Sequence, residues 1–236
     1  MKAPRIPIAH EGYPFILFCV FATLVAGLLE SAIACIAGVM ITGFVTWFFR
    51  DPDRIIPDRP DAFVSPADGK VILIEEMFDE RFTRSTVRKV SIFMNIFNVH
   101  VNRFPFEGTV RSVTLKPGKF YSADSERSAL QNEYCAMTVT TENSLTYGVV
   151  QVAGLIARRI VCWAEQGDRI QTGIRYGLIR FGSRLDLYLP LNVELTVALG
   201  DRVKAGESVL GILSAPEEEV IQRDSQPEEP VPNQTG

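Results

Sequence analysis

The chain has 236 residues, of which 47% are hydrophobic and 22% charged, and its formal net charge at neutral pH is −4. This length allows one globular domain of ordinary size and one further segment. The apolar content excludes a disordered protein, and four cysteines are too few for a disulfide scaffold. The mild negative charge excludes the basic stripe of a nucleic-acid-binding domain.

Two apolar runs stand near the N-terminus. Residues 12–29 and 31–49 contain no charged side chain, and only Glu30 separates them. As helices they would measure roughly 27–29 Å, close to the ~30 Å hydrocarbon core of a bilayer. Basic residues flank the pair on both sides and are absent at the join, which predicts a membrane-associated helical hairpin over residues 1–50 with both ends in the cytoplasm. The alternative is a buried or amphipathic helical pair in a soluble fold. A signal peptide fits poorly because a second apolar run follows at once.

Short runs rich in β-branched residues follow one another from Ala62 to Leu213, and Gly, Pro, Asn or Asp separate them. No long helical periodicity interrupts these runs, so the sequence predicts a mainly β sandwich or barrel over residues 51–214. The last residues, 215–236, contain six carboxylates and four prolines. They are predicted to form a disordered acidic tail.

Two segments of the predicted β domain share a pattern: GDRIQTGIRYG at 167–177 and GDRVKAGESVLG at 200–211. In both, Gly-Asp favours a turn, and a second glycine favours another. Two such hairpins predict a pseudo-symmetric barrel-sandwich, the shape of lipoyl and biotinyl carrier domains. The alternative is that two unrelated hairpins use the same turn chemistry.

Three residues of the β region could carry chemistry. His100 lies between two valines, so in a strand its imidazole would face away from both, and its ordinary pKa lies near neutral pH. Asp68 lies in the turn SPADG and could orient a histidine. Ser183 follows Gly182, which permits backbone conformations closed to other residues. Each also has an ordinary interpretation: a core or surface histidine, a turn aspartate and a turn serine.

These segments, in their order and spacing, resemble the phosphatidylserine decarboxylase proenzymes in their short prokaryotic (archaeal-type) form. The resemblance runs from FFRDPDR at 48–54 to about Leu213. The segments that carry it are SPADGKV at 65–71, FNVHVNRFP at 97–105, PGKF at 117–120, NE at 132–133, QVAGLIARRIVC at 151–162, IRYGLIRFGSRLDLYLP at 174–190 and GDRVKAGESVLG at 200–211.

The resemblance implies an enzyme that cuts its own chain between Gly182 and Ser183. The hydroxyl of Ser183 would attack the Gly182 carbonyl. Elimination and loss of ammonia would then leave a pyruvoyl group, a pyruvic acid residue derived from Ser183, as the covalent cofactor; no metal is expected. The β chain, 1–182, and the α chain, 183–236, would remain associated because strands on both sides of the cut share one core.

The resemblance also implies that Asp68, His100 and Ser183 form a charge-relay set. The sequence departs from the family pattern at two places. Arg184 follows the cleavage serine, where family members often have Ser or Thr. A second histidine of the longer members is absent from the residues before His100, so its role as a proton donor cannot be transferred.

The implied activity is the conversion of phosphatidylserine into phosphatidylethanolamine and carbon dioxide in phospholipid biosynthesis. The substrate is a membrane lipid, so the expected location is the cell (inner) membrane, with the catalytic domain on its cytoplasmic face. Arg158 and Arg159, or Arg54, would meet the lipid phosphate; the alternative is that these arginines are solvated or structural.

Two other functions stay open at this point. One is a membrane-tethered, lipoyl-like carrier domain, for which Lys204 would be the hairpin lysine. The other is a membrane serine hydrolase that uses the same three residues without cutting itself. Association of several copies into a homo-oligomer stays open too.

Overall fold

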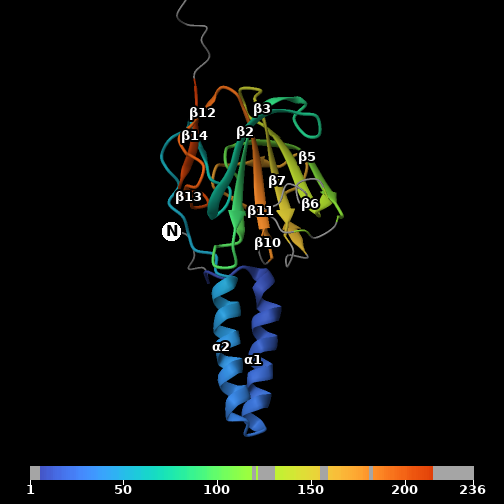
Figure 1. Ribbon diagram of the computed structural model, residues 1–236, viewed down its shortest axis with the longest axis vertical. Helices are drawn as coiled ribbons and strands as arrows, with labels where there is room; N and C mark the ends of the chain where they lie inside the picture. Colours follow the sequence, from blue (N-terminus) through green and yellow to red (C-terminus); the bar gives the residue numbers. More distant parts are fainter. Residues whose placement is uncertain (1–5, 119–120, 122–130, 155–158, 181–182, 215–236) are drawn as a thin grey trace, which may run out of the picture.

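The computed structural model describes residues 6–118, 121, 131–154, 159–180 and 183–214. An apolar helical pair stands below a β domain, as Figure 1 shows. The expected fold class, mainly β with an apolar helical segment before it, is therefore confirmed, whereas the lipoyl-type shape stays a prediction. The helical elements are a 3₁₀ turn η1 (His10–Gly12), α1 (Tyr13–Leu28) and α2 (Ala32–Phe48). The predicted tail lies outside the described residues.

The two helices pack through small side chains. The chain reverses between them at Glu30, which has a φ of 56°. A Cβ atom added at Gly38 would lie 2.5 Å from Oγ1 of Thr23, so only a glycine allows this close approach of the helices. Most of the large apolar side chains of both helices are exposed. Apolar surface of this extent indicates a lipid or protein environment around the helices.

The stretch His10–Leu28 is long and apolar enough to cross a membrane, and almost none of it is buried inside the protein. The second helix, Ala32–Phe48, is apolar but shorter. The length and composition of the first stretch support an association with membranes, and the two-pass hairpin stays a proposal.

The β domain is built from short strands that form three sheets within the described residues. The large sheet has the order β13-β2-β3-β11-β7-β6-β5-β9, and the small ones have the orders β1-β14-β12 and β4-β10-β8. The strands are β1 (Ala62–Val64), β2 (Gly69–Asp79), β3 (Ser85–Met94), β4 (Val101–Arg103), β5 (Gly108–Lys116), β6 (Tyr134–Thr140), β7 (Thr146–Ala153), β8 (Ile160–Cys162), β9 (Arg169–Ile170), β10 (Arg175–Ile179), β11 (Ser183–Pro190), β12 (Val193–Leu195), β13 (Arg202–Val203) and β14 (Val209–Leu213).

Strand β11 is the centre of the domain. It pairs with β3 along its whole length and with β7 over six residues, antiparallel on both sides. Its side chains alternate between two buried faces. Leu185, Leu187 and Leu189 join the main core, and Tyr188 joins a smaller cluster on the other face. The residue that starts β11 is therefore held on two sides by strands from earlier in the chain.

The repeated hairpins adopt the same backbone conformation. Gly167 and Gly200, which open the two turns, have φ values of 96° and 98°, and Gly173 and Gly206, which close them, have values of 78° and 76°. Residues other than glycine rarely adopt this left-handed backbone conformation, so both turns need glycine at both positions. The sequence repeat therefore corresponds to a structural repeat.

The large sheet extends this repeat into two similar halves. The register shifts after Val71 in β2 and after Val110 in β5. The backbone N–H of each valine donates, at 2.9 Å in both cases, to the carbonyl of the aspartate in one Gly-Asp turn. Three residues before these valines stand Asp68 and Glu107, which therefore occupy equivalent positions in the two halves.

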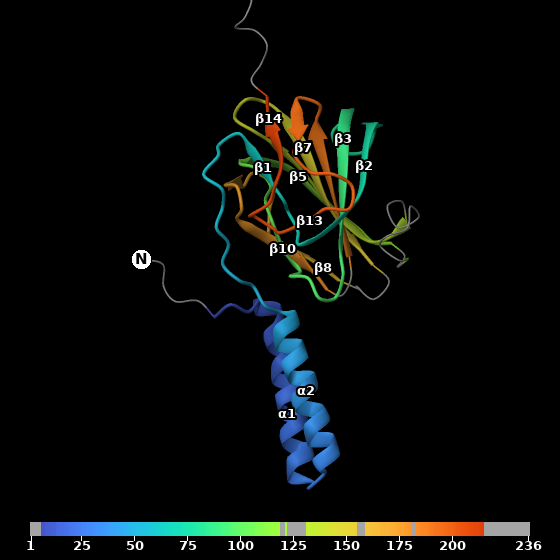
Figure 2. The ribbon, with the colours of Figure 1, turned by 60° about the vertical axis from the view of Figure 1, so that its left-hand side comes forward.

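Asp51 connects the helical pair to the β domain. Its side chain is 1% exposed; Oδ1 accepts a hydrogen bond from Nε of Arg175 at 2.7 Å and lies 3.5 Å from Nη2 of Arg103. Burial and the charge of Arg175 lower the pKa of Arg103 to about 10, while the Asp51 charge raises it. One carboxylate therefore balances two guanidinium groups. From here the chain runs along the outside of the β domain to β1 (Figure 2).

Candidate functional site

Ser183 is the first residue of β11 and is completely buried. It lies opposite Met94 of β3 and Ala153 of β7. Its Oγ has no hydrogen-bond partner within the described part of the chain. A buried hydroxyl without a hydrogen-bond partner destabilises a fold. A role in the chemistry of the site would explain why the chain keeps such a group. Gly182, the other residue of the expected cleavage site, lies outside the described residues.

His100 directly precedes β4 and is 3% exposed. Its Nδ1 lies 3.0 Å from the carbonyl oxygen of Asn98. A carbonyl can only accept, so Nδ1 carries the hydrogen and Nε2 is the nitrogen able to take up a proton. Burial lowers the pKa of His100 to about 4; the Asn98 hydrogen bond raises it and the Arg50 charge lowers it further. The imidazole is thus a neutral base at cellular pH.

The strands that carry the histidine and the serine meet at one end of the domain. The N–H of Ile179, the last residue of β10, donates to the His100 carbonyl at 3.3 Å, and Ser183 begins the next strand along the chain. Nδ2 of Asn102 in β4 lies 3.7 Å from Sδ of Met94, the residue opposite Ser183. Figure 1 shows the lower end of β10 next to the tops of the helices. This end of the domain therefore faces the helical pair.

Asp68 lies in a charged cluster with Arg54, and its charge acts on Arg50. Nη2 of Arg54 donates to both of its carboxylate oxygens, at 3.0 and 2.9 Å, and the N–H of Ala205 donates to Oδ1 at 2.8 Å. The charges of Asp68 and Arg54 both act on Arg50, and Arg50 in turn acts on His100. The structure thus pairs Asp68 with Arg54, while Nδ1 of His100 faces a backbone carbonyl.

Arg184, which follows the expected cleavage serine, faces away from the Ser183 side of the strand. It is 3% exposed, and its Nη2 donates to Oδ2 of Asp186 at 2.9 Å. Its guanidinium is therefore balanced on the opposite face of β11. A different residue type after the serine does not by itself alter the interior face on which Ser183 lies.

Sequence reasoning missed two buried amides near the serine. Gln151 of β7 stands two positions from the partner of Ser183 and therefore on the same interior face. Its Nε2 donates to Oδ1 of Asn102 at 2.9 Å, and both residues are 0% exposed. A Cβ atom at Gly177 would lie 3.1 Å from this Nε2, so a glycine leaves room for the amide. For Gln151 the available signal was one polar residue inside the apolar run GVVQVAG; Asn102 stands among other polar residues in FNVHVNRFP and gave no such signal.

Of the three arginines offered for the lipid phosphate, Arg54 forms ion pairs with Asp68 and Glu207, and Arg158 lies outside the described residues. Arg159 is exposed, and its carbonyl accepts a hydrogen bond from the N–H of Arg180 at 3.3 Å. Arg180 thus joins the candidate set as a residue that the sequence did not single out.

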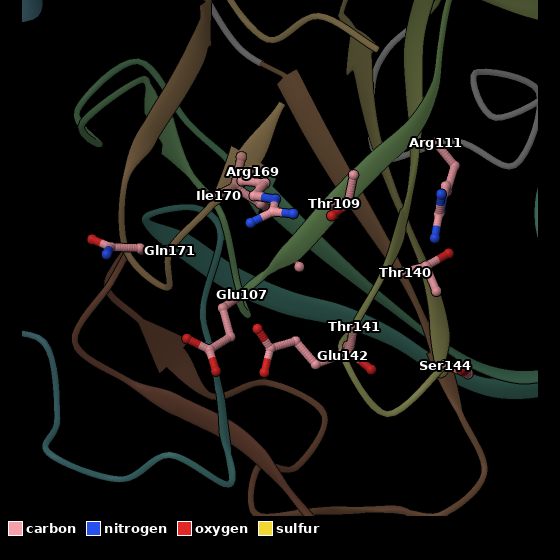
Figure 3. Close-up of a pocket in the computed structure, with 11 residues that line it drawn as sticks. Glu107, Thr109, Arg111, Thr140, Thr141, Glu142, Ser144, Arg169, Ile170 and Gln171 are labelled. Carbon is pink, nitrogen blue, oxygen red and sulfur yellow. The ribbon is translucent and has the colours of Figure 1, made fainter. Parts of the chain in front are cut away.

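A cavity of about 430 Å³ lies elsewhere, at the end of β6 and β7 where the Thr140–Thr146 pair leads into their connecting turn. This is the end of β7 opposite Ala153, and so opposite the serine. Figure 3 shows the carboxylates of Glu107 and Glu142 near each other in this cavity. Glu107 is the counterpart of Asp68 in the structural repeat. The cavity therefore occupies, in one half of the sheet, the place that the surroundings of Asp68 occupy in the other half.

A buried serine and a neutral imidazole lie at the same end of the β domain, which is the end that faces the apolar helical pair. This arrangement has the character of a membrane-associated enzyme. The family model for phosphatidylserine decarboxylase matches residues 41–211, and the chain belongs to this family. Relatives named phosphatidylserine decarboxylase proenzyme support the assignment. That of Desulfotalea psychrophila is 53% identical over 89% of this chain and 99% of its own length. Those of Geotalea uraniireducens and Geobacter sulfurreducens are 48% and 49% identical over 90% of this chain and all of their own.

Proposed function

We propose that this chain is a self-processing, pyruvoyl-dependent decarboxylase that converts phosphatidylserine into phosphatidylethanolamine and carbon dioxide. The observation that carries the proposal is the buried hydroxyl of Ser183, which has no partner within the described residues and lies at the same end of the β domain as a neutral His100. The family supports a decarboxylase formed as a proenzyme. The carrier-domain alternative is not favoured: Lys204 is exposed and near Glu207, but the similar proteins are named as decarboxylase proenzymes and not as carriers. The same names give no support to a serine hydrolase.

Self-processing begins with a proton transfer. Nε2 of His100 accepts the hydroxyl proton of Ser183, and Oγ bonds to the carbonyl carbon of Gly182. The bond from that carbon to the Ser183 nitrogen breaks, the nitrogen takes the proton, and an ester results. Elimination then transfers the Cα proton of residue 183 to water and breaks the Cβ–Oγ bond, which leaves a carboxylate on Gly182 and dehydroalanine at position 183. One water molecule converts the dehydroalanine into the ketone and releases ammonia, so atoms balance.

Position 183 fits a pyruvoyl group. Within the described residues, the Ser183 hydroxyl makes no hydrogen bond that would be lost when its oxygen leaves with Gly182. The pyruvoyl group supplies an electrophilic carbonyl that bonds to the substrate amine and takes up electrons as carbon dioxide leaves. His100 is then no longer needed for processing. We propose that it carries the proton that returns to the substrate α carbon.

Asp68 is proposed as the third member of the set. Its carboxylate offsets the positive charge of Arg54 and acts on Arg50, the cation whose charge lowers the pKa of His100. Removing the Asp68 charge would therefore leave more positive charge near the imidazole. In this role Asp68 acts on the histidine indirectly, through its effect on the charges of Arg54 and Arg50.

The two product chains, 1–182 and 183–236, are proposed to stay together. Strand β11 would open the α chain, yet it lies between β3 and β7 of the β chain. Strands β13 and β14 likewise pair with β2 and β1. Two sheets therefore contain strands from both products: the large sheet includes β11 and β13 of the α chain, and the sheet β1-β14-β12 joins two α-chain strands to β1 of the β chain. Neither product keeps a complete core alone.

The helical pair is proposed to hold the site at the cytoplasmic surface of the cell membrane. Trp47, near the end of α2, packs against Phe97 of the β domain with ring centroids 6.1 Å apart, and the Arg50 guanidinium lies 3.9 Å from the Trp47 ring centroid. Aromatic and basic residues favour the interface between lipid and water. A diacyl lipid substrate leaves the bilayer slowly, so a site at this level suits it.

A denaturing gel with intact-mass measurement tests the proposal. The purified wild-type protein should give two fragments, with the smaller one starting at position 183 and carrying a ketone in place of its amine. Ser183→Ala should stay in one piece and lack decarboxylase activity. An unbroken wild-type chain that still decarboxylates phosphatidylserine would refute it.

A further inference from the structure

Two arginines lie side by side near the processing site. Arg159 precedes β8, and Arg180 follows β10; these strands pair with Ile160 opposite Ile179. The N–H of Arg180 donates to the carbonyl of Arg159 at 3.3 Å. Both backbone positions therefore stand at the same end of the small sheet, and Arg180 is also close in sequence to Ser183.

Neither guanidinium has a carboxylate partner among the residues that the structure describes. None of the ion pairs formed within these ranges includes Arg159 or Arg180. Nε of Arg180 is buried and lacks a hydrogen-bond acceptor within the same residues. Glu11 is close enough for its charge to act on Arg180, but Oε1 of Glu11 accepts from the Trp163 indole at 2.9 Å.

Electrostatics reinforces this picture. Burial lowers the pKa of Arg180, and the positive charge of Arg159 lowers it further, while the Glu11 charge raises it. Two positive charges that are held close together in a partly buried position destabilise each other. A bound anion would relieve both the repulsion and the missing hydrogen bond.

The pair stands at the level where a phospholipid headgroup would lie. The Arg180 guanidinium carbon is 5.1 Å from the ring centroid of Phe15, in the first turn of α1, and Phe15 stacks on Phe49 at 5.5 Å. The last residue of β10, next to Arg180, is hydrogen-bonded to the His100 carbonyl. The Arg180 side chain thus lies beside the first turn of α1, and its backbone directly follows the residue that is hydrogen-bonded to the proposed base.

We infer that Arg159 and Arg180 bind the phosphodiester of the lipid substrate. This inference rests on the proposed function. Arginine suits phosphate because its planar fork of N–H donors matches two phosphate oxygens. The substrate carboxylate is the wrong target, since it leaves as carbon dioxide, and an arginine that stabilised it would raise the barrier. The phosphodiester is unchanged by the reaction, so its binding lowers KM and leaves kcat alone.

The test uses phosphatidylserine in mixed micelles of a non-ionic detergent and the variants Arg159→Gln, Arg180→Gln and Arg180→Lys. Arg111→Gln is the matched control, because Arg111 lines the cavity at the far end of β6 and β7. A gel first shows whether each variant forms its two chains. That result reports on the proposed self-processing and is separate from substrate binding. A second substrate, an O-alkylserine, carries the amine and carboxylate but no phosphate.

For processed protein, each Gln variant should raise KM for phosphatidylserine about tenfold or more, with kcat within about twofold. Arg180→Lys should fall between wild type and Arg180→Gln, and Arg111→Gln should match wild type. Turnover of the O-alkylserine should be the same in all five proteins. An unchanged KM in both Gln variants, a loss confined to kcat, or an equal loss with the phosphate-free substrate would each overturn the inference.

Discussion

The imidazole of His100 lies against the phenyl ring of Phe48, with ring centroids 4.5 Å apart. Phe48 is the last residue of α2 and is 1% exposed. The end of the second apolar helix therefore covers the histidine that we propose as the base. Phe48 contributes to the burial that keeps the His100 imidazole neutral. The contact therefore links the apolar helical pair to the protonation state of the proposed base.

The pH dependence of self-processing should follow this burial. Because burial lowers the pKa of His100 from 6.5 to about 4, the rate of cleavage should be constant from about pH 8 to about pH 5 and fall about tenfold per pH unit below the pKa. Phe48→Ala should move the midpoint upward, toward 6.5, by exposing the ring. Freshly translated precursor, shifted to each pH and followed on gels, gives the rates. A wild-type midpoint near 6.5 would contradict the argument.

The same pKa shift affects stability. The unfolded chain binds this proton at about pH 6.5, whereas the folded protein binds it only near pH 4. The free energy of unfolding should therefore fall as the pH drops from 6.5 towards 4. Chemical denaturation of Ser183→Ala, which stays one chain, would measure the slope. In Ser183→Ala/His100→Phe this part of the slope should disappear.

Removing the base should stop maturation with little effect on the fold. In His100→Ala, cleavage should slow by about 10²–10⁴-fold, the usual contribution of general-base catalysis. Added imidazole should restore part of the rate by occupying the space left by the side chain. His10→Ala is the matched control, since His10 packs edge-on against Tyr13 at the start of α1. Wild-type cleavage in His100→Ala would exclude the histidine as the base.

The Asp51 junction should be important for stability. Asp51→Ala removes the carboxylate between the side chains of Arg103 and Arg175, which are 6% and 20% exposed. Removing one partner of a buried ion pair lowers the free energy of unfolding by about 3–5 kcal/mol. Asp53→Ala removes a carboxylate that is 90% exposed and should cost under about 1 kcal/mol. Thermal unfolding in detergent compares the two, and equal melting temperatures would disprove the special role of Asp51.

The buried amide pair should tie the strand next to the histidine to the strand next to the serine. Gln151→Leu leaves Oδ1 of Asn102 without the donor it has at 2.9 Å, which costs about 1–3 kcal/mol. We expect a lower melting temperature and slower self-cleavage. Thr138→Val, which breaks the more exposed hydrogen bond to Ser112, should lower stability without slowing cleavage. Normal cleavage in Gln151→Leu would show that the pair serves stability alone.

The sequence predicted the class of fold because its signals are local. Gly, Pro, Asn and Asp separate runs of β-branched residues, and each run needs only its own residues to favour a strand. The uncharged runs before Arg50 predicted the helices in the same way. The order of strands in the sheets could not be read from these signals, because pairing such as that of β11 with β3 depends on contacts across the whole chain.

The candidate site was predictable only in part. Ser183 and His100 stood out by residue type and by their neighbours, and the structure brings their strands to one end of the domain. The partner of Asp68 did not stand out. Arg54 reaches Asp68 because the segment after α2 follows the outside of the β domain, a path that no local pattern encodes. The Gln151–Asn102 pair was hidden for a similar reason: 49 residues separate its members.

The position of β11 at the centre of the large sheet has a consequence for recovery from heat or denaturant. The precursor folds as one molecule, at a rate independent of its concentration. If the chain is cut before Ser183, as proposed, the unfolded enzyme would have to bring two polypeptides together before its core could form, which is a second-order step that competes with aggregation. Refolding yield should therefore be high for the uncut precursor and should depend on dilution for the matured protein, so the lifetime of the working enzyme is set by how slowly it unfolds.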